Sequence, residues 1–252
     1  MTGAAHSILE AIGDYWLLLR AVLKDVFTNG INARDLGKQV VYIGNQSIPI
    51  VLLTAAFTGM VMALQTAYGL QRFGAKLYVG NIVSLALVRE LGPALTGVML
   101  CGRVGAGIAA EIGSMVVTEQ VDAIRSLGAD PIRKLVSPRI AAAVFVLPLL
   151  VVLADLIGIL GGGVIAVLEL DLTRHTYYRS IVNFVTLRDV FDGLIKSAFF
   201  GFLFVSIACF IGLRCRGGTE GVGRATTEAV VFGSIVILIS DLFLTKFLII
   251  LS

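Results

Sequence analysis

The chain is too apolar to be a soluble domain of its length. It has 252 residues, of which 57% are hydrophobic and 15% are charged, whereas a soluble domain carries roughly 25% charged residues to keep its surface hydrated. The formal net charge of +3 is small, and no basic run is interleaved with aromatic residues, which argues against nucleic-acid binding. The composition therefore predicts an integral membrane protein.

The few cysteines and histidines do not indicate a metal site or a disulfide framework. Cys101, Cys209 and Cys215 show neither paired nor metal-ligand spacing. His6 and His175 are the only histidines, too few to build a histidine-based metal centre. We expect no metal site and no catalytic residue in this chain.

Residues 1–38 predict an amphipathic helix and a linker that do not cross the membrane. Ser7 and Glu10 form a capping-box pattern at the expected start of this helix. Apolar residues then recur at helical spacing, at positions 8, 12, 15, 19, 22 and 26. Charged side chains would have to enter the hydrocarbon if the helix spanned, among them Glu10, Asp14, Lys24 and Asp25. We therefore expect an interfacial (elbow) helix on the cytoplasmic surface; the alternative is a soluble tail helix packed on a partner.

Residues 39–252 contain five stretches that are long and apolar enough to cross a membrane as helices. They cover about 47–70, 79–117, 140–168, 194–213 and 229–251. The first is roughly 36 Å long at about 1.5 Å per residue, enough to cross the hydrocarbon core with some tilt. The second is too long for one crossing, so we expect its end to project into water. The predicted fold is all-α, with about five transmembrane helices after the interfacial helix.

Lysine and arginine are unevenly shared between the two sides of the predicted membrane. The segments on the side of the N-terminus contain Arg20, Lys24, Arg34, Lys38, Arg125, Arg133, Lys134, Arg139, Arg214, Arg216 and Arg224. The segments on the other side contain Arg72, Lys76, Arg174, Arg179 and Arg188. Because positively charged loops remain cytoplasmic, we expect a cytoplasmic N-terminus and, after five crossings, a C-terminus on the opposite side.

The segment "LVRELGP", residues 87–93, places Arg89 and Glu90 inside the second span. Adjacent helical residues point about 100° apart, so these two charges are poorly placed to neutralise each other. A charge at the centre of a lone helix costs at least about 2.5 kcal/mol. Pro93 lacks the N–H that would bond the carbonyl of Arg89, so the helix should bend and free that polar group. The pattern favours a polar pocket in the membrane; the alternative is a structural pair in which each charge meets a residue from another span, Asp155 for example.

The segment "TEQVDAIRSLGADPIRKLVSPR", residues 118–139, predicts a short helix that cannot span. Thr118 is suited to cap its start, and Gly128 is suited to end it in the left-handed conformation. Asp130 and Pro131 then have the pattern of a cap and first residue of a following helix. The alternative is a plain loop between two spans.

This short helix has an apolar side and a charged side. The apolar side carries Val121, Ile124 and Leu127, whereas Glu119, Asp122 and Arg125 point elsewhere. A rigid two-turn rod with such a stripe suits a groove on a cytoplasmic partner.

Glycine-rich stretches elsewhere predict packing or turns. Residues 102–113 and 158–164 are dense in Gly or Ala, which lets helices approach closely; part of the first stretch also suits a subunit interface. Residues 217–224, "GGTEGVGR", are expected to form a cytoplasmic turn because no strand precedes them. Residues 170–189 mix aromatic side chains with Arg, as interfacial belts do.

Two blocks of the sequence resemble a known family. Residues 90–139, "ELGPALTGVMLCGRVGAGIAAEIGSMVVTEQVDAIRSLGADPIRKLVSPR", are similar to the signature region of the MlaE (YrbE-type) permeases of MCE lipid-transport systems. Residues 217–231, "GGTEGVGRATTEAVV", resemble the second signature of that family. The likeness covers nearly the whole chain, so residues 39–252 would form an MlaE-type permease domain.

The resemblance implies the transmembrane permease subunit of an ABC transporter in the bacterial inner membrane. Such a subunit would move phospholipids between that membrane and a periplasmic partner, in support of outer membrane lipid asymmetry. The implied partners are a second copy in a homodimer, a cytoplasmic ABC ATPase subunit, a periplasmic MCE-domain (MlaD-like) protein and a STAS-domain (MlaB-like) protein.

The sequence agrees with one of these implications independently. It contains no G-x-x-x-x-G-K-[ST] phosphate loop, so we expect this chain not to be an enzyme and not to bind a cofactor. ATP would be used by the partner subunit.

The resemblance also implies two sets of site residues. The lipid-binding set is Arg89, Glu90, Met62, Leu70 and Phe73. Arg89 would offer planar donors to a phosphate group, and Glu90 would hold Arg89 in place or pair across the dimer. The set that couples to the ATPase is Glu119, Gln120, Asp122, Ile124, Arg125 and Leu127.

Two functions of other classes compete with this interpretation. A self-sufficient secondary carrier could use Arg89 and Glu90 as an ion or proton relay, although the chain shows no internal repeat of the kind from which carriers are often built. A non-transporting membrane anchor of a complex is the other alternative.

Overall fold

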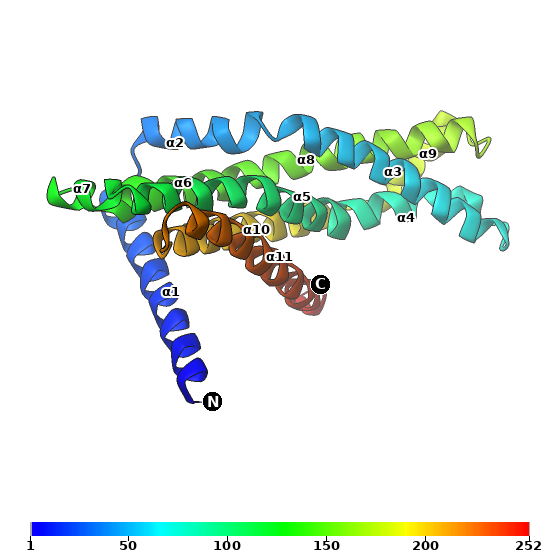
Figure 1. The fold of residues 1–252 in the computed structure, drawn as a ribbon. Coiled ribbons are helices and arrows are strands. Elements are labelled where there is room, and N and C mark those ends of the chain that lie inside the picture. Colours follow the sequence, from blue (N-terminus) through cyan, green and yellow to red (C-terminus); the bar gives the residue numbers. More distant parts are fainter. Residues whose placement is uncertain (1, 252) are drawn as a thin grey trace. The chain divides into compact units, whose positions relative to one another are not determined.

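The computed structural model describes residues 2–251, and for residues 2–8, 29 and 251 it describes the backbone alone. Every secondary-structure element of the described residues is helical (Figure 1). Five helical stretches are long and apolar enough to cross a membrane: Ala33–Gln71, Lys76–Val117, Ile132–Leu168, Leu187–Leu213 and Gly218–Ile250. The predicted all-α fold with five spans is therefore confirmed.

The chain folds into two compact units, each assembled from three segments. Unit 1 comprises Met1–Ile43, Leu100–Val144 and Gly201–Ile237, and unit 2 comprises Gly44–Met99, Phe145–Phe200 and Leu238–Ser252. Three long helices contribute residues to both units: α8 (Ser137–Leu168), α10 (Leu187–Leu213) and α11 (Gly218–Leu251).

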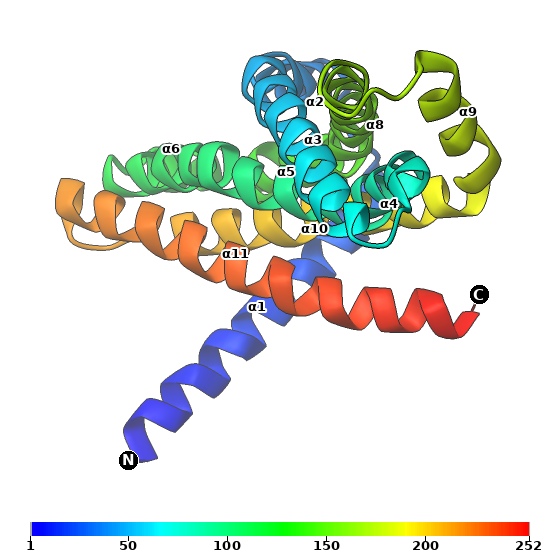
Figure 2. The same cartoon turned by 90° about the vertical axis from the view of Figure 1, so that its right-hand side faces the viewer.

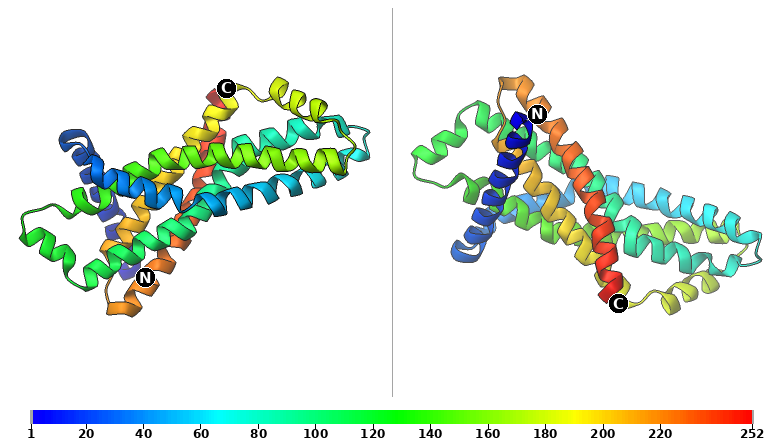
Figure 3. Two further views of the ribbon diagram at one scale, coloured as in Figure 1. Left: turned by 90° about the horizontal axis from the view of Figure 1, so that it is seen from above. Right: turned by 90° about the horizontal axis from the view of Figure 1, so that it is seen from below.

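Unit 1 contains the N-terminal helices and the segment with the short helix between spans. Besides its parts of the long helices, it holds α1 (Thr2–Asn29), α2 (Ala33–Val40), η4 (Cys101–Gly105), α6 (Ala106–Val117), α7 (Gln120–Ser126) and η5 (Ile132–Val136). The π-helical turn η1 (Val41–Asn45) follows α2 at the boundary between the units. Helix α7 forms the tip of the connection between α6 and α8 (Figures 1 and 3).

The predicted N-terminal helix is present as α1, but it begins earlier than expected. Leu18 and Val22 are buried, whereas Trp16 and Phe27 are exposed. The helix already starts at Thr2, so the residues before Ser7 are part of it. The predicted start at Ser7 is therefore wrong, and the side chain of Ser7 lies outside the described residues.

Unit 2 contains most of the first span and the N-terminal half of the second. Its remaining elements are α3 (Ile48–Gln71), η2 (Lys76–Tyr78), α4 (Val79–Ala86), η3 (Leu87–Leu91), α5 (Gly92–Leu100) and α9 (Arg174–Phe184). Helices α3 and α4 share a core of small and branched residues: Ala63, Ala67, Val79, Val83 and Leu87.

Glycines bring α3 and α8 into backbone contact, as the Gly-rich stretch 158–164 predicts. A Cβ atom on Gly59 would overlap the backbone of Gly158, so only glycine allows this approach. Helices surrounded by lipid have no hydrophobic driving force to associate, so the close van der Waals packing that small residues allow stabilises their contact instead. The predicted role of this stretch in helix packing is confirmed.

A helix, α9, lies where the sequence predicted only an interfacial belt. The Thr173 hydroxyl accepts a hydrogen bond from the backbone N–H of Thr176 and so caps its start. Its residues Tyr177 and Ile181 are buried, and burial raises the pKa of the Tyr177 phenol. The helix packs beside α4 (Figure 2). The cap at Thr173 was the overlooked signal.

The predicted turn over residues 217–224 is mostly wrong. Gly217 and Gly218 have positive φ angles of 94° and 66°, as a tight turn requires. Helix α11 begins at Gly218, however, so the rest of that segment forms its first turns. The Glu220 carboxylate and the Arg224 guanidinium, four residues apart, form an ion pair at 3.7 Å. A pair at this spacing stabilises the helical conformation.

Candidate functional site

In unit 2, the regular α-helix of the second span is interrupted at the charged pair Arg89 and Glu90. Residues Leu87–Leu91 form a π-helical turn, η3, immediately before Pro93. The carbonyl of Arg89, which Pro93 cannot bond, accepts a hydrogen bond from Nζ of Lys196 at 3.0 Å. The predicted release of this carbonyl is confirmed, and its partner comes from α10.

Lys196 lies at the centre of a buried polar cluster. Its side chain is 2% exposed, and Nζ is 2.6 Å from Oε2 of Glu90 and 2.7 Å from Oγ1 of Thr245. With the Arg89 carbonyl, these acceptors can use all three N–H groups of the ammonium. Asp241 Oδ1 lies 3.3 Å from the same nitrogen. The cluster therefore places two carboxylates against one ammonium.

Arg89 points away from this cluster, toward the start of α10. Its NH1 atom is 3.5 Å from Oδ1 of Asp189, and its side chain is 28% exposed. Oδ2 of Asp189 accepts hydrogen bonds from the Thr186 backbone N–H at 2.8 Å and from the Thr186 hydroxyl at 2.7 Å. This reciprocal cap fixes Asp189 at the helix start. Because a guanidinium has five donors and this ion pair is long, Arg89 retains donors for a ligand.

The alternative of a structural pair is correct in outline but wrong about Asp155. Glu90 and Arg89 meet Lys196 and Asp189, which lie about two turns apart on α10. Asp155 makes no hydrogen bond or ion pair with any described residue, and its Oδ1 atom is buried. A lone lysine in an otherwise apolar span was the signal for the true partner of Glu90, because such residues face the protein interior and pair there.

The three apolar residues of the predicted lipid set lie on and beyond α3. Met62 and Leu70 are partly buried and pack against the core shared by α3 and α4. Phe73 follows the end of α3 and is 81% exposed. The described cavities are not lined by any member of the predicted lipid set.

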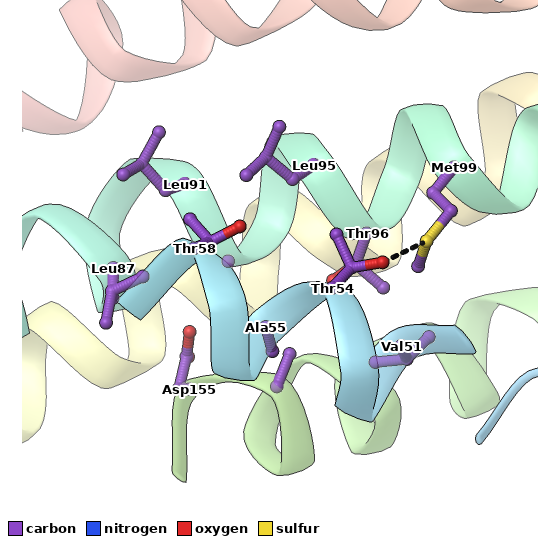
Figure 4. A pocket seen from close by; sticks show the side chains of 12 residues that line it. Val51, Thr54, Ala55, Thr58, Leu87, Leu91, Leu95, Thr96, Met99 and Asp155 are labelled. Atoms are coloured by element: carbon purple, nitrogen blue, oxygen red, sulfur yellow. Dashed lines mark hydrogen bonds between the residues drawn. The ribbon is translucent and has the colours of Figure 1, made fainter. Parts of the chain in front are cut away.

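A small cavity in unit 2 lies beside the bend (Figure 4). It has a volume of about 20 Å³, close to that of a single water molecule. Its walls come from α3, η3, α5 and α8, and they include Thr54, Thr58, Leu87, Thr96 and Asp155. In Figure 4 the carboxyl group of Asp155 points from α8 toward Leu87 and Thr58. The Thr54 hydroxyl is 3.3 Å from the sulfur of Met99.

A larger groove lies within unit 1, between α1, α10 and α11. Its volume is about 770 Å³, and its lining includes Tyr15, Arg214, Arg216, Arg224 and Glu228 among apolar side chains. The Tyr15 hydroxyl lies 2.7 Å from that of Ser206, and burial raises the pKa of the Tyr15 phenol. Arg214 pairs with Asp14 at 3.3 Å. These contacts hold α1 against α10 and the residue that follows it.

Unit 1 also contains the predicted short helix. Gly128 has φ 77°, as the predicted left-handed terminator requires, and Oδ1 of Asp130 accepts from the backbone N–H of Ile132 at 2.9 Å. Thr118 does not cap the start; its hydroxyl donates to the carbonyl of Ser114 at 2.8 Å. Glu119 instead turns the chain with φ 59°. That positive φ redirects the chain out of α6, so the predicted cap at Thr118 is wrong.

The side chains of α7 divide between its own unit and solvent. Val121 is 4% exposed, whereas Leu127 is 85% exposed. Ile124 is intermediate, and Glu119, Gln120, Asp122 and Arg125 are exposed. Arg125 and Asp122 form an ion pair at 3.0 Å. Part of the apolar stripe therefore anchors α7 to unit 1, and the remainder is open to a partner.

Ion pairs brace the segment that follows α7. The Arg139 guanidinium, 3% exposed, lies 2.7 Å from Oε1 of Glu111 on α6. Lys134 donates to Asp35 at 2.8 Å, and the buried Asp25 accepts from the Ser137 hydroxyl at 2.7 Å. The base of α7 is thus fixed to α1, α2 and α6 of the same unit.

The family model described as Permease MlaE matches residues 36–247. The chain is 46% identical over 239 residues to a probable ABC transporter permease protein of Rickettsia typhi, covering 95% of this chain and 92% of the relative. It is 40% identical over 246 residues to a probable ABC transporter permease protein of Synechocystis, covering 96% and 94%. It is 38% identical over 209 residues to the intermembrane phospholipid transport system permease protein MlaE of Haemophilus influenzae, covering 82% and 80%. Together with the five spans, these matches establish that the chain is a multi-pass membrane protein of the MlaE permease family, an ABC transporter permease subunit.

Proposed function

We propose that this chain carries phospholipid through the inner membrane to or from a periplasmic MCE-domain protein. It works as a homodimer whose ATP is hydrolysed by a separate cytoplasmic ATPase subunit, with a STAS-domain protein as a further partner. The phospholipid substrate is suggested by the name of the Haemophilus influenzae relative. The N-terminus is cytoplasmic and the C-terminus periplasmic, as the lysine and arginine distribution favours.

The observation that carries the proposal is the partly exposed Arg89 beside the cluster that the buried Lys196 ammonium holds together. Lys196 holds Glu90 and the Arg89 carbonyl, which fixes the backbone at the bend. The Arg89 guanidinium is left with a single long ion pair and can therefore bind the phosphate of a lipid head group through two parallel hydrogen bonds. In this role Glu90 positions Arg89 through their shared turn, while Phe73, Met62 and Leu70 contribute apolar surface of α3.

Helix α7 is proposed to dock on the ATPase. Leu127 and the exposed polar residues Glu119, Gln120, Asp122 and Arg125 form the docking face, with Ile124 beneath them. The ion pairs at the base of α7 make it a rigid lever, which is what transmission of an ATPase movement to the spans requires.

Lipid retention by the purified complex tests the role of Arg89. A charge-assisted hydrogen bond contributes about 1.5–3 kcal/mol, which corresponds to roughly ten- to hundredfold in affinity. We expect native mass spectrometry to show much less copurified phospholipid with Arg89→Ala, and an intermediate amount with Arg89→Lys, which keeps the charge but loses the planar fork.

Arg179→Ala is the matched control, because Arg179 is an exposed arginine of the same unit on α9. It should retain the wild-type amount of lipid. Equal lipid in the Arg89→Ala and Arg179→Ala complexes would contradict the assignment.

Transfer of lipid in proteoliposomes separates this function from the other two. The proposal requires ATP and the ATPase subunit for transfer. A self-sufficient carrier would need only a proton gradient, and an anchor would give no transfer under either condition.

A further inference from the structure

Asp155 is the carboxyl group that the proposed transport mechanism leaves unused. It lies within α8, in the candidate span Ile132–Leu168, and its Oδ1 atom is buried without a hydrogen-bond partner among the described residues. An ionisable side chain within a span normally pairs with another group or faces water. Asp155 therefore requires an explanation of its own.

Its surroundings contain no compensating charge. The residues that line the cavity beside it come from α3, η3, α5 and α8, and Asp155 is the only titratable one among them. The nearest charges on η3, Arg89 and Glu90, are directed to Asp189 and Lys196. The wall on α3 offers hydroxyls and apolar groups, Thr54 and Thr58 among them (Figure 4).

The packing leaves little room to hydrate the buried oxygen, Oδ1, of Asp155. A Cβ atom placed on Gly92 would overlap Oδ1 of Asp155, so the carboxyl lies directly against the α5 backbone. The adjoining cavity of about 20 Å³ admits about one water molecule. An ionised carboxylate has about four acceptor positions to satisfy, and those of the buried Oδ1 meet no donor here.

A metal cation fits this cavity poorly. Oxygen-ligated cations of the calcium and magnesium type take six or more ligands. Here the lining offers one carboxyl group and the hydroxyls of Thr54, Thr58 and Thr96, and the Thr54 hydroxyl already donates to the carbonyl of Ile50 at 2.8 Å. A single proton neutralises the carboxyl without any further ligand.

We propose that Asp155 is a proton-binding site within the membrane. In the packing seen here its carboxyl group carries a proton and is neutral. Separation of α3 and α5 from α8 would admit water to the cavity, and the carboxyl would then release its proton. Proton occupancy at Asp155 therefore favours the closed packing of these three helices, independently of what substrate the chain carries.

Dicyclohexylcarbodiimide tests the protonation state directly, because it forms a stable adduct with protonated carboxyl groups in apolar surroundings. We expect mass spectrometry of the labelled chain in detergent to find the adduct at Asp155, with a yield that falls several-fold between about pH 5 and about pH 8. Asp155→Asn should lose it. Glu90 is the internal control, because the Lys196 ammonium lies against its carboxylate, and it should remain unlabelled.

A second measurement does not depend on access of the reagent. Asp155→Asn imitates the neutral carboxyl group, so the difference in melting temperature between wild type and variant isolates the proton at this position. We expect the two melting temperatures to agree at or below about pH 4, where an aspartate in the unfolded chain also keeps its proton, and that of the wild type to fall below that of Asp155→Asn as the pH rises.

Two results would overturn the proposal. If labelling of Asp155 is absent and the melting difference does not change with pH, the carboxyl group is ionised in the folded protein. If sodium chloride in place of choline chloride protects Asp155 from the reagent, the site binds a cation and not a proton.

Discussion

Two ion pairs of similar length occupy opposite environments in this molecule. In unit 2, Lys196 and Glu90 lie 2.6 Å apart, with the lysine side chain 2% exposed. On α7 in unit 1, Arg125 and Asp122 lie 3.0 Å apart, with side chains 64% and 69% exposed. Distance alone therefore says little about what each pair contributes.

The two ion pairs contribute differently to stability because different surroundings would meet the charge that remains after one partner is removed. On α7, water solvates whichever charge remains, so the pair contributes little to stability. At Lys196, whose side chain is 2% exposed, a lost ammonium removes the donor to the Arg89 carbonyl and the cation beside two carboxylates, and leaves Glu90 only the Thr245 hydroxyl at 3.2 Å. The first pair is free to be exchanged for contacts with a partner, whereas the second fixes the fold around the bend.

The largest expected effect is that of Lys196→Met. Removing one partner of a buried pair costs about 3–5 kcal/mol, so we expect a strongly lowered melting temperature in detergent or a loss of folded protein. Lys246→Met is the matched control, because Lys246 is an exposed lysine of the same unit. If the two variants had the same melting temperature, the Lys196 cluster would not contribute to the stability of the fold.

Gly92→Ala should have an intermediate effect. The added Cβ would overlap Oδ1 of Asp155, and overpacking of this kind costs about 1–3 kcal/mol. The comparison is Gly102→Ala, where an added Cβ meets no atom within 4 Å. Melting measurements should also show that Asp155→Ala restores part of the stability lost in Gly92→Ala, because the contact of the added Cβ with the Leu87 carbonyl oxygen at 2.9 Å remains; an additive loss in the double variant would mean that the two side chains do not touch.

Arg125→Ala should have the smallest effect on stability, within about 0.5 kcal/mol, because the side chain is exposed and its pair is solvated. If α7 docks on an ATPase subunit, the same variant should bind that subunit more weakly in a pull-down from detergent. Arg216→Ala, at another exposed arginine of unit 1, serves as the control. Unaltered binding by Arg125→Ala, or equal loss in both variants, would argue against docking through this face.

The predictions that rested on local chemistry were largely confirmed. The apolar stretches became spans, because a continuous run of such residues has no alternative to burial in lipid or protein. Gly128 and Asp130 ended one helix and began the next, since left-handed backbone and side-chain capping are decided within a few residues. The Arg89 carbonyl that Pro93 cannot bond belongs to the same class.

The predictions that were wrong concerned features that depend on contacts between segments far apart in the sequence. Glu119, and not Thr118, makes the turn into α7, because the burial of Val121 sets the direction that the chain must take. Helix α9 is amphipathic only weakly by sequence, and its place beside α4 supplies the buried surface for Tyr177. The roles assigned to Met62, Leu70 and Phe73 in lipid binding remain predictions.

The sequence by itself determined that this chain is a helical membrane protein with an N-terminal helix, five spans and a short helix between the second and third, because hydropathy and helix signals act locally. Only the tertiary structure decided which charges meet, since Glu90 and Lys196 are far apart along the chain and the register between α10 and the bend brings them together. The same register leaves Asp155 without a partner. Long-range electrostatic satisfaction depends on helix packing, and helix packing in lipid is set by small residues and close contacts that no single segment reveals.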